Sequence, residues 1–233
     1  MSHRSSGGFT LIEIAIVLVI IGLLLGGIVK GSELITSARV RALISKQDGI
    51  RAAYYGFEER FRAIPGDYAQ ATANISGATQ NGNGNGRIEN TAVPNESILA
   101  WEHLTQSGFL SPTFVYSATE SALTSPSNSS GVFLQIVYDG IYGAGTTGAP
   151  GSLRHNIKTG SQIPVQILAE ADRKIDDGLP NTGGFQFSRY QGNGAAAPTD
   201  GATAAPACTS ATTAAGVWNS TNGSTNCGGA SLL

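Results

Sequence analysis

The sequence predicts an α+β protein in which one long N-terminal helix packs on a small antiparallel β-sheet head with long loops. Residues 9–29 form an apolar run long enough to cross a bilayer as a helix. Apolar side chains then recur every three or four residues up to residue 64, which is typical of an amphipathic helix. Beyond that point, short strand-like runs alternate with stretches rich in Gly, Ser, Thr and Asn.

We therefore divide the chain into four parts. Residues 1–8 are a short polar leader, 9–29 a transmembrane helix, 30–63 its amphipathic continuation, and 64–233 a globular α+β head. Residues 30–62 carry more basic than acidic side chains, whereas the head is acidic. This asymmetry favours attraction between the helix of one copy and the head of another, unless it only reflects two separately solvated surfaces.

The apolar segment carries one charge, Glu13. A carboxylate in lipid is costly, which makes it a candidate functional residue. The alternatives are a side chain that reaches the interface and one that is protonated. Gly7 and Gly8 stand before the apolar run, whereas a secretory signal places its small-residue cleavage site after that run.

The stretch GGFTLIEIAIVLVIIGLLL resembles the N-terminal signature of type IV pilins and of the pseudopilins of type II secretion systems. The resemblance implies that a prepilin peptidase cuts between Gly8 and Phe9 and that Phe9 is then N-methylated. It also places Glu13 at the family's assembly glutamate. Pairing of Glu13 with the Phe9 amine of an adjacent copy would neutralise two charges in a low dielectric and fix the axial register.

Many pilins have a proline where this chain has Lys30. We expect the nearby glycines to allow a bend or local melting of the helix instead; these are Gly22, Gly26, Gly27 and Gly31. The apolar stripe of the second half is expected to be core; it comprises Ile50, Tyr54, Phe57, Phe61 and Ile64. Pro65 then ends the helix, at about Arg62.

Two groups of oxygen-bearing side chains in the head are candidate calcium sites. Residues 80–90 have the cadence of a calcium loop, with ligands Asn81, Asn83, Asn85 and Glu89. Its low charge predicts weak affinity unless the fold adds Asp67 or Glu96, and the alternative is a polar turn. The second group is Asp172, Asp176 and Asp177, for which the alternative is a solvated helix end with turn-forming aspartates.

Elsewhere in the head, residues 95–107 are predicted to form a helix capped by Asn95, and 164–175 a second helix. Strands are predicted at 114–117, 132–138 and 185–190. Cys208 and Cys227 pair as a disulfide if the chain is exported and are incidental thiols if it is cytosolic. The segment they bound resembles the C-terminal disulfide loop of many type IV pilins.

The sequence offers no catalytic constellation, because His3, His103 and His155 are scattered and common nucleotide, zinc and hydrolase motifs are absent. We predict that the chain is not an enzyme. Calcium is the one cofactor for which the sequence offers candidate ligands. Charged residues are only 13% of the chain, which argues against strong nucleic-acid binding.

The resemblance implies a structural subunit of a type IV pilus or type II secretion pseudopilus. Its expected partners are itself, other pilin-like subunits, the prepilin peptidase, the inner-membrane assembly platform and membrane lipid. The expected location is the bacterial inner membrane with the head in the periplasm, and then a filament in the periplasm or at the cell surface. The alternative is a minor tip pilin or tethered binding module that captures DNA or carbohydrate.

Overall fold

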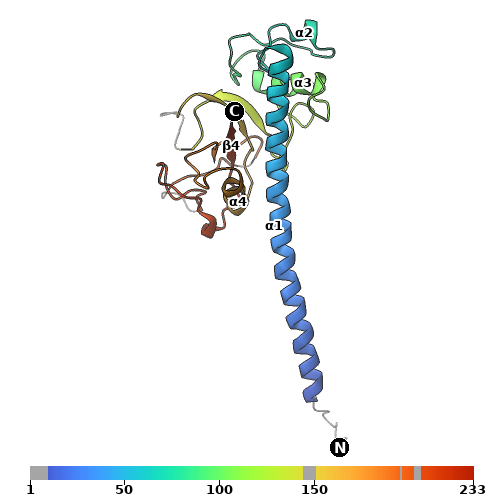
Figure 1. The fold of residues 1–233 in the computed structure, drawn as a ribbon, viewed down its shortest axis with the longest axis vertical. Helices are drawn as coiled ribbons and strands as arrows, with labels where there is room; N and C mark the ends of the chain where they lie inside the picture. The colour runs from blue at the N-terminus through green and yellow to red at the C-terminus, as the bar shows by residue number, and fades with distance from the viewer. Residues whose placement is uncertain (1–9, 144–150, 195, 202–205) are drawn as a thin grey trace, which may run out of the picture. The chain divides into compact units, whose positions relative to one another are not determined.

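The protein is described by a computed structural model that covers residues 10–143, 151–194, 196–201 and 206–233. The chain divides into two compact units, with the boundary between Arg39 and Val40. One helix, α1 (Leu11–Phe61), contributes residues to both units. Figure 1 labels the helices α1 to α4 and the strand β4.

Helix α1 confirms the predicted long helix and ends one residue before the predicted position. Arg62 adopts a positive φ of 53°, which breaks the helical repeat just ahead of Pro65. The glycine-rich stretch of α1 is not melted, because Gly22, Gly26, Gly27 and Gly31 all lie within continuous helix. Hydrogen bonds within a long apolar helix outweigh the roughly 1 kcal/mol propensity cost of each glycine.

The second unit contains a four-stranded antiparallel sheet in the order β1-β2-β4-β3. Its strands are β1 (Gln135–Asp139), β2 (Arg154–Lys158), β3 (Phe185–Phe187) and β4 (Gly229–Leu232). In Figure 1, β4 lies next to the C-terminus of the chain. The sheet confirms the predicted small antiparallel head.

The individual strands were predicted less well than the sheet. The runs at 132–138 and 185–190 correspond to β1 and to the shorter β3, but 114–117 is not a strand, so that prediction was wrong. Strands β2 and β4 were not predicted. Their sequences, RHNIK and GASL, lack the alternating β-branched residues that mark a strand.

The described residues of the unit also form four helical elements: α2 (Ala71–Asn74), α3 (Glu96–Gln106), α4 (Val165–Ile175) and the 3-10 turn η1 (Ser220–Asn222). Helices α3 and α4 confirm two predictions. Asn95 caps α3 as predicted, since its Oδ1 accepts a hydrogen bond from Ser97 N at 3.1 Å.

Two hydrophobic cores hold the unit together. The first core joins the predicted stripe of α1 to α3 and the sheet; its members include Ile50, Tyr54, Phe57, Trp101, Leu104, Ile136 and Ile157, with Phe61 and Ile64 partly buried against it. The second core joins Val40 to α4, β3 and the C-terminal tail; it includes Leu168, Phe185, Phe187, Trp218, Cys208 and Cys227. Both cores are dominated by large apolar groups, whose burial is the main favourable term in folding.

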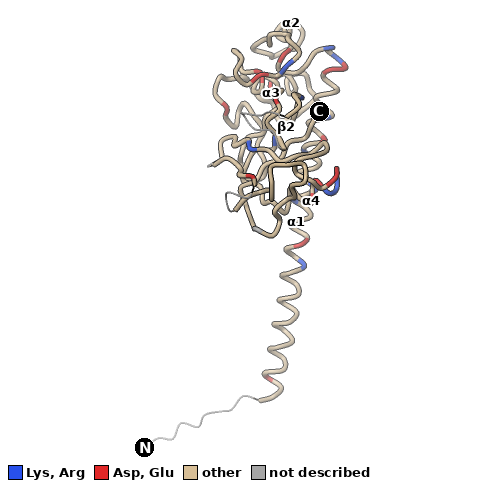
Figure 2. Tube along the Cα trace, turned by 90° about the vertical axis from the view of Figure 1, so that its left-hand side faces the viewer, with Lys and Arg blue, Asp and Glu red and all other residues tan. Residues whose placement is uncertain are grey.

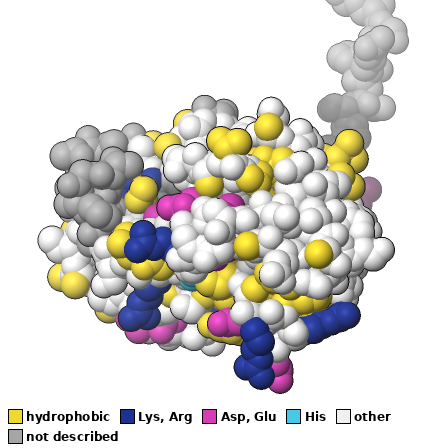
Figure 3. All heavy atoms as spheres, turned by 90° about the horizontal axis from the view of Figure 1, so that it is seen from above, with side chains coloured by type: hydrophobic (Ala, Val, Ile, Leu, Met, Phe, Trp, Pro, Cys, Tyr) yellow, Lys and Arg dark blue, Asp and Glu magenta, His cyan; other side chains and the backbone are white. Residues whose placement is uncertain are grey.

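Charged side chains are unevenly distributed along the chain. Figure 2 shows a long uncharged stretch of α1, which the sequence places between Glu13 and Lys30. On the face of the head seen in Figure 3, basic side chains lie at separate points with acidic side chains beside some of them.

Candidate functional site

The first turn of α1 is a capping box formed by Thr10 and Glu13. Glu13 Oε2 accepts hydrogen bonds from Thr10 N at 2.8 Å and from Thr10 Oγ1 at 2.7 Å, while Thr10 Oγ1 accepts from Glu13 N at 3.3 Å. The carboxylate is thereby fixed at the positive end of the helix dipole. The pattern Thr-x-x-Glu is the sequence signal for this cap, and our prediction for Glu13 did not use it.

The helix behind this cap has the length and composition of a membrane span. Among the residues that the structure describes, one helix, α1, is long and apolar enough to cross a bilayer. Its apolar side chains from Leu11 to Ile35 are exposed, and the first charges after Glu13 are Lys30 and Glu33, paired at 2.8 Å. The predicted cleavage residues Gly8 and Phe9 lie outside the described residues.

The predicted calcium loop is held by two buried carboxylates. Asp67 accepts hydrogen bonds from Asn85 N at 2.9 Å and Gly86 N at 2.7 Å. Glu96 accepts from Asn83 N at 3.0 Å through one oxygen and from a further backbone N–H of the loop through the other. Burial raises the pKa of Glu96, and the backbone N–H groups oppose this shift. The loop therefore wraps around carboxylates through its N–H donors.

The four predicted ligands of that loop form hydrogen bonds with other groups of the protein. Asn81 Oδ1 accepts from the backbone and hydroxyl of Thr72 at 2.9 and 3.1 Å. Asn83 and Asn85 instead direct their amide nitrogens at Glu89 Oε2, at 3.4 and 2.9 Å. These side chains are therefore engaged within the protein, whereas a calcium ion requires six to eight oxygen ligands. Calcium binding at this loop stays a prediction from the sequence.

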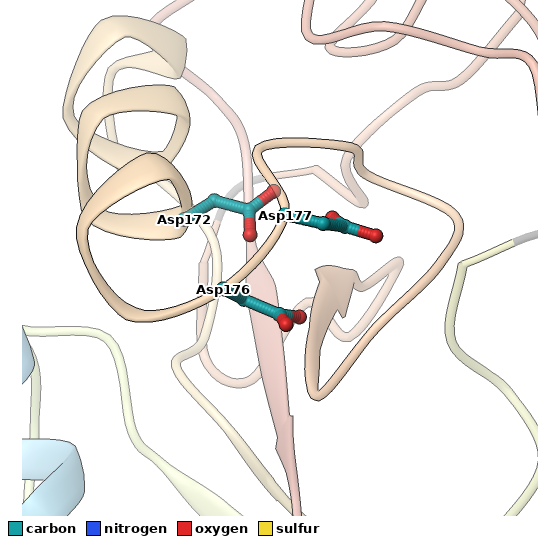
Figure 4. Close-up of side chains that lie close together, drawn as sticks. All are labelled: Asp172, Asp176 and Asp177. Atoms are coloured by element: carbon teal, nitrogen blue, oxygen red, sulfur yellow. The ribbon is translucent and has the colours of Figure 1, made fainter.

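The three aspartates at the end of α4 do come together. Each offers one carboxylate oxygen, and these oxygens lie within 4.8 Å of one another. Figure 4 shows the three side chains near one another, Asp172 on the last turn of α4 and Asp176 and Asp177 on the turn that follows. The turn is fixed by hydrogen bonds to the exposed pair, since Asp176 accepts from Phe185 N at 3.0 Å and Asp177 from Leu179 N at 2.8 Å. The buried member is Asp172.

Asp172 is the unusual residue of this cluster. It is 0% exposed, and its Oδ2 accepts a 2.6 Å hydrogen bond from Trp218 Nε1. Its Oδ1 is buried and accepts no hydrogen bond of ordinary geometry among the described residues, although the backbone N–H of Gly178 lies close enough to lower the pKa of the carboxyl group. Burial raises the pKa of Asp172 to about 7; the Trp218 bond opposes this shift, and the neighbouring charges of Asp177 and Asp176 add to it. A cation that prefers oxygen ligands, such as calcium, would coordinate Oδ1 and offset the repulsion among the carboxylates.

The C-terminal tail holds Trp218 against this cluster. Cys208 and Cys227 form the predicted disulfide, with their Cα atoms 5.7 Å apart. Cys227 pairs by a backbone bridge with Ile163, just before α4, while Trp218 pairs with Thr209 beside the other half-cystine. The disulfide thus links the tail to the start of α4, and Asp172 lies two turns further along that helix.

The two described histidines occupy separate positions in the head, His103 buried and His155 partly buried. His103 is buried, and its Nδ1 accepts a 3.0 Å hydrogen bond from Gly66 N. His155 lies 4.9 Å from the Tyr138 ring, measured between centroids, and burial lowers its pKa to about 4. Each histidine therefore has a packing role in the head.

Comparison with known proteins identifies the N-terminal segment. The family model for the prokaryotic N-terminal methylation motif matches residues 3–29, which is the signature of type IV pilins and pseudopilins. No curated protein and no solved structure matches the chain. The match covers the segment that contains Gly8, Phe9, Thr10 and Glu13, and the long helix on a small antiparallel sheet is a pilin-like arrangement.

Proposed function

We propose that this pilin-like protein is a structural subunit of a helical filament, either a type IV pilus or a type II secretion pseudopilus. The observation that carries the proposal is the order of leader, glycine, capped apolar helix and glutamate, which coincides with the methylation motif. The proposal assigns no catalytic role to the chain. A prepilin peptidase cuts between Gly8 and Phe9, and Phe9 is N-methylated.

In this proposal the apolar half of α1 changes its surroundings during assembly. It first anchors the subunit in the inner membrane with the head in the periplasm. The assembly platform then transfers it into the filament, where the helices of other subunits replace lipid around the exposed side chains from Leu11 to Ile35. The partners are therefore copies of this chain, other pilin-like subunits and the processing and assembly machinery.

Glu13 sets the axial position of each subunit in this proposal. Cleavage frees an amine at Phe9, and that positive charge pairs with Glu13 of a neighbouring copy. The capping box supports this role because it holds the Glu13 carboxylate in a defined place at the helix start. Mutation can separate two functions of Glu13: it caps the helix locally, and its charge pairs with the Phe9 amine of an adjacent subunit.

The experiment compares Glu13→Gln with Thr10→Ala in cells that assemble the filament. Gln still accepts hydrogen bonds in a capping box but has no charge, whereas Thr10→Ala weakens the cap and keeps the charge. We expect both variants to be processed, Glu13→Gln to lose most of its filament yield and Thr10→Ala to keep most of it. Full assembly of Glu13→Gln would refute the charge-pairing role.

A calcium site at Asp172, Asp176 and Asp177 is a second element of the proposed function. The buried Oδ1 of Asp172, which accepts no hydrogen bond of ordinary geometry among the described residues, favours it over a solvated helix end. Bound calcium would fix the turn between α4 and β3 and so stabilise the head outside the cytoplasm, where calcium is abundant enough for millimolar sites. Calcium should raise the midpoint of thermal unfolding of the wild-type protein but leave that of Asp172→Asn unchanged.

A further inference from the structure

A buried ion pair joins the first two strands of the sheet. Lys158 Nζ on β2 contacts Asp139 Oδ2 on β1. The lysine side chain is only 4% exposed and that of Asp139 is 17% exposed. Removal of both charges from water is expensive, so this pair differs from an ordinary surface ion pair.

The strand register explains how these two groups meet. Lys158 lies opposite Gln135, whereas Asp139 lies opposite Arg154, so all four side chains are on one face of the antiparallel pair. The lysine side chain must therefore extend along β2, past Asn156 on the same face, to reach the carboxylate. In this extended conformation, Lys158 Nζ contacts the Asp139 carboxyl group.

Asn156 completes the cluster. It is fully buried, and its Nδ2 donates a 3.0 Å hydrogen bond to Asp139 Oδ1, the oxygen that Lys158 does not contact. The Tyr190 ring centroid lies 6.0 Å from Lys158 Nζ and covers the amine with an aromatic surface. Burial lowers the pKa of Lys158, although the Asp139 charge and hydrogen bond oppose this effect. A neutral amine is a nucleophile, whereas an ammonium ion is not.

We propose that Lys158 and Asp139 condense to an intramolecular amide that joins β2 to β1. The lysine ammonium first transfers a proton to the Asp139 carboxylate, which leaves a neutral amine beside a carboxylic acid. Nζ then attacks Asp139 Cγ, and the developing charge on Oδ1 is stabilised by the N–H of Asn156. The new Cγ–Nζ bond forms as the Cγ–Oδ2 bond breaks, and Oδ2 leaves as water with a second proton from Nζ.

The fold supplies what this condensation needs. Contact between amine and carboxyl raises their effective concentration by many orders of magnitude, and the buried site disfavours the charged reactants relative to a neutral amide. The partly exposed edge of Asp139 gives the water a way out. The amide would fasten the edge strand β1 independently of the disulfide, which is anchored beside α4.

The chain contains its own control for this chemistry. Lys174 and Glu170 form an ion pair at 2.6 Å on the surface of α4, with side chains 44% and 34% exposed. Water solvates both groups there and keeps them charged, so we expect no condensation. The two lysines can be compared in one digest of one sample.

The test is peptide mass spectrometry of the full-length protein, purified in detergent, reduced, denatured and digested with trypsin. We expect no cleavage after Lys158, and a branched peptide whose mass is the sum of the parts that contain Asp139 and Lys158 less one water. Cleavage after Lys174 should be complete. Lys158→Arg keeps a positive charge and should remove the branched peptide.

Two outcomes would overturn the proposal. Recovery of the free peptide 155–158 with no linked form would show that the pair is only ionic. A fragment that contains residues 155–158, is not joined to the Asp139 peptide and has lost ammonia would place the bond on Asn156 rather than on Asp139. Because the readout is at the peptide level, neither outcome depends on processing at Phe9 or on filament assembly.

Discussion

Substitution of Asp172 by Asn should change how the stability of the head depends on pH. The pKa of Asp172 is raised in the folded protein to about 7, from an ordinary 3.8. A raised carboxyl pKa means that the folded state binds the proton more tightly than the unfolded state does. The contribution is fully present below pH 3.8 and is lost as pH rises toward 7, because the unfolded chain then releases its proton first.

The magnitude follows from the size of that shift. Each pH unit inside the window between the two pKa values changes the free energy of unfolding by at most about 1.4 kcal/mol. Over the window from 3.8 to about 7 the total is on the order of 4 kcal/mol, as an upper limit. Asn resembles the protonated acid and still accepts the hydrogen bond from Trp218 Nε1, so the variant should lack this pH dependence.

The assay is denaturant unfolding of wild type and Asp172→Asn from pH 4.5 to 8 in a chelator, followed by tryptophan fluorescence. Trp218 contacts the substituted group, which makes the signal local. The two proteins should be similar near pH 4.5, and the variant should be the more stable above pH 7. Calcium should stabilise wild type more at pH 8 than at pH 5, because it competes with the proton. Asp176→Asn, at an exposed member of the cluster, is the matched control.

Curves for wild type and Asp172→Asn that stay parallel across this range would refute the reasoning. They would mean that Asp172 is ionised at neutral pH in spite of its burial. A calcium effect of equal size in both proteins would separately remove the proposed metal site.

Three further predictions concern the packing of the head, and each is checked by denaturant unfolding. Phe57→Ala should destabilise the folded protein by about 3–5 kcal/mol, because the ring is fully buried in the first core. The control Tyr55→Ala, at a residue 46% exposed, should cost under about 1 kcal/mol. Equal losses in the two variants would contradict the assigned core. Gln47→Leu should stabilise by about 1–3 kcal/mol, since both amide atoms of Gln47 are buried without partners among the described residues; a loss of stability would reveal a partner for the amide. Replacing Cys208 and Cys227 by Ser should cost about 3 kcal/mol, as expected for a cross-link between residues 19 apart, and an unchanged midpoint would show that the bond does not constrain the tail.

The features predicted correctly from sequence are those with a strong local signal. The apolar run and the three-to-four spacing give α1, and Asn95 gives the start of α3. Three aspartates within six residues bring their carboxylates together at the end of α4, while calcium binding there stays a prediction. Local patterns of this kind depend on neighbours in the chain, so a single sequence is enough to reveal them.

The features that were missed depend on contacts between distant residues. Strand β4 is GASL, which has little strand propensity, and it becomes a strand because it lies between β2 and β3. Glu96 was considered as a calcium ligand, yet it accepts backbone N–H groups from a loop that only the fold brings near. The cluster of Lys158, Asp139 and Asn156 likewise depends on the register of β1 with β2.

The mature N-terminus is the most direct test of the central claim. Mass spectrometry of the protein isolated from the membrane of its native host should find a chain that begins at Phe9 with a methylated α-amine. That result would show processing by a prepilin peptidase at the junction between Gly8 and Phe9. An intact Met1, or a terminus beyond Gly27 from a conventional signal peptidase, would contradict the account, because the apolar helix would then not become the core of a filament.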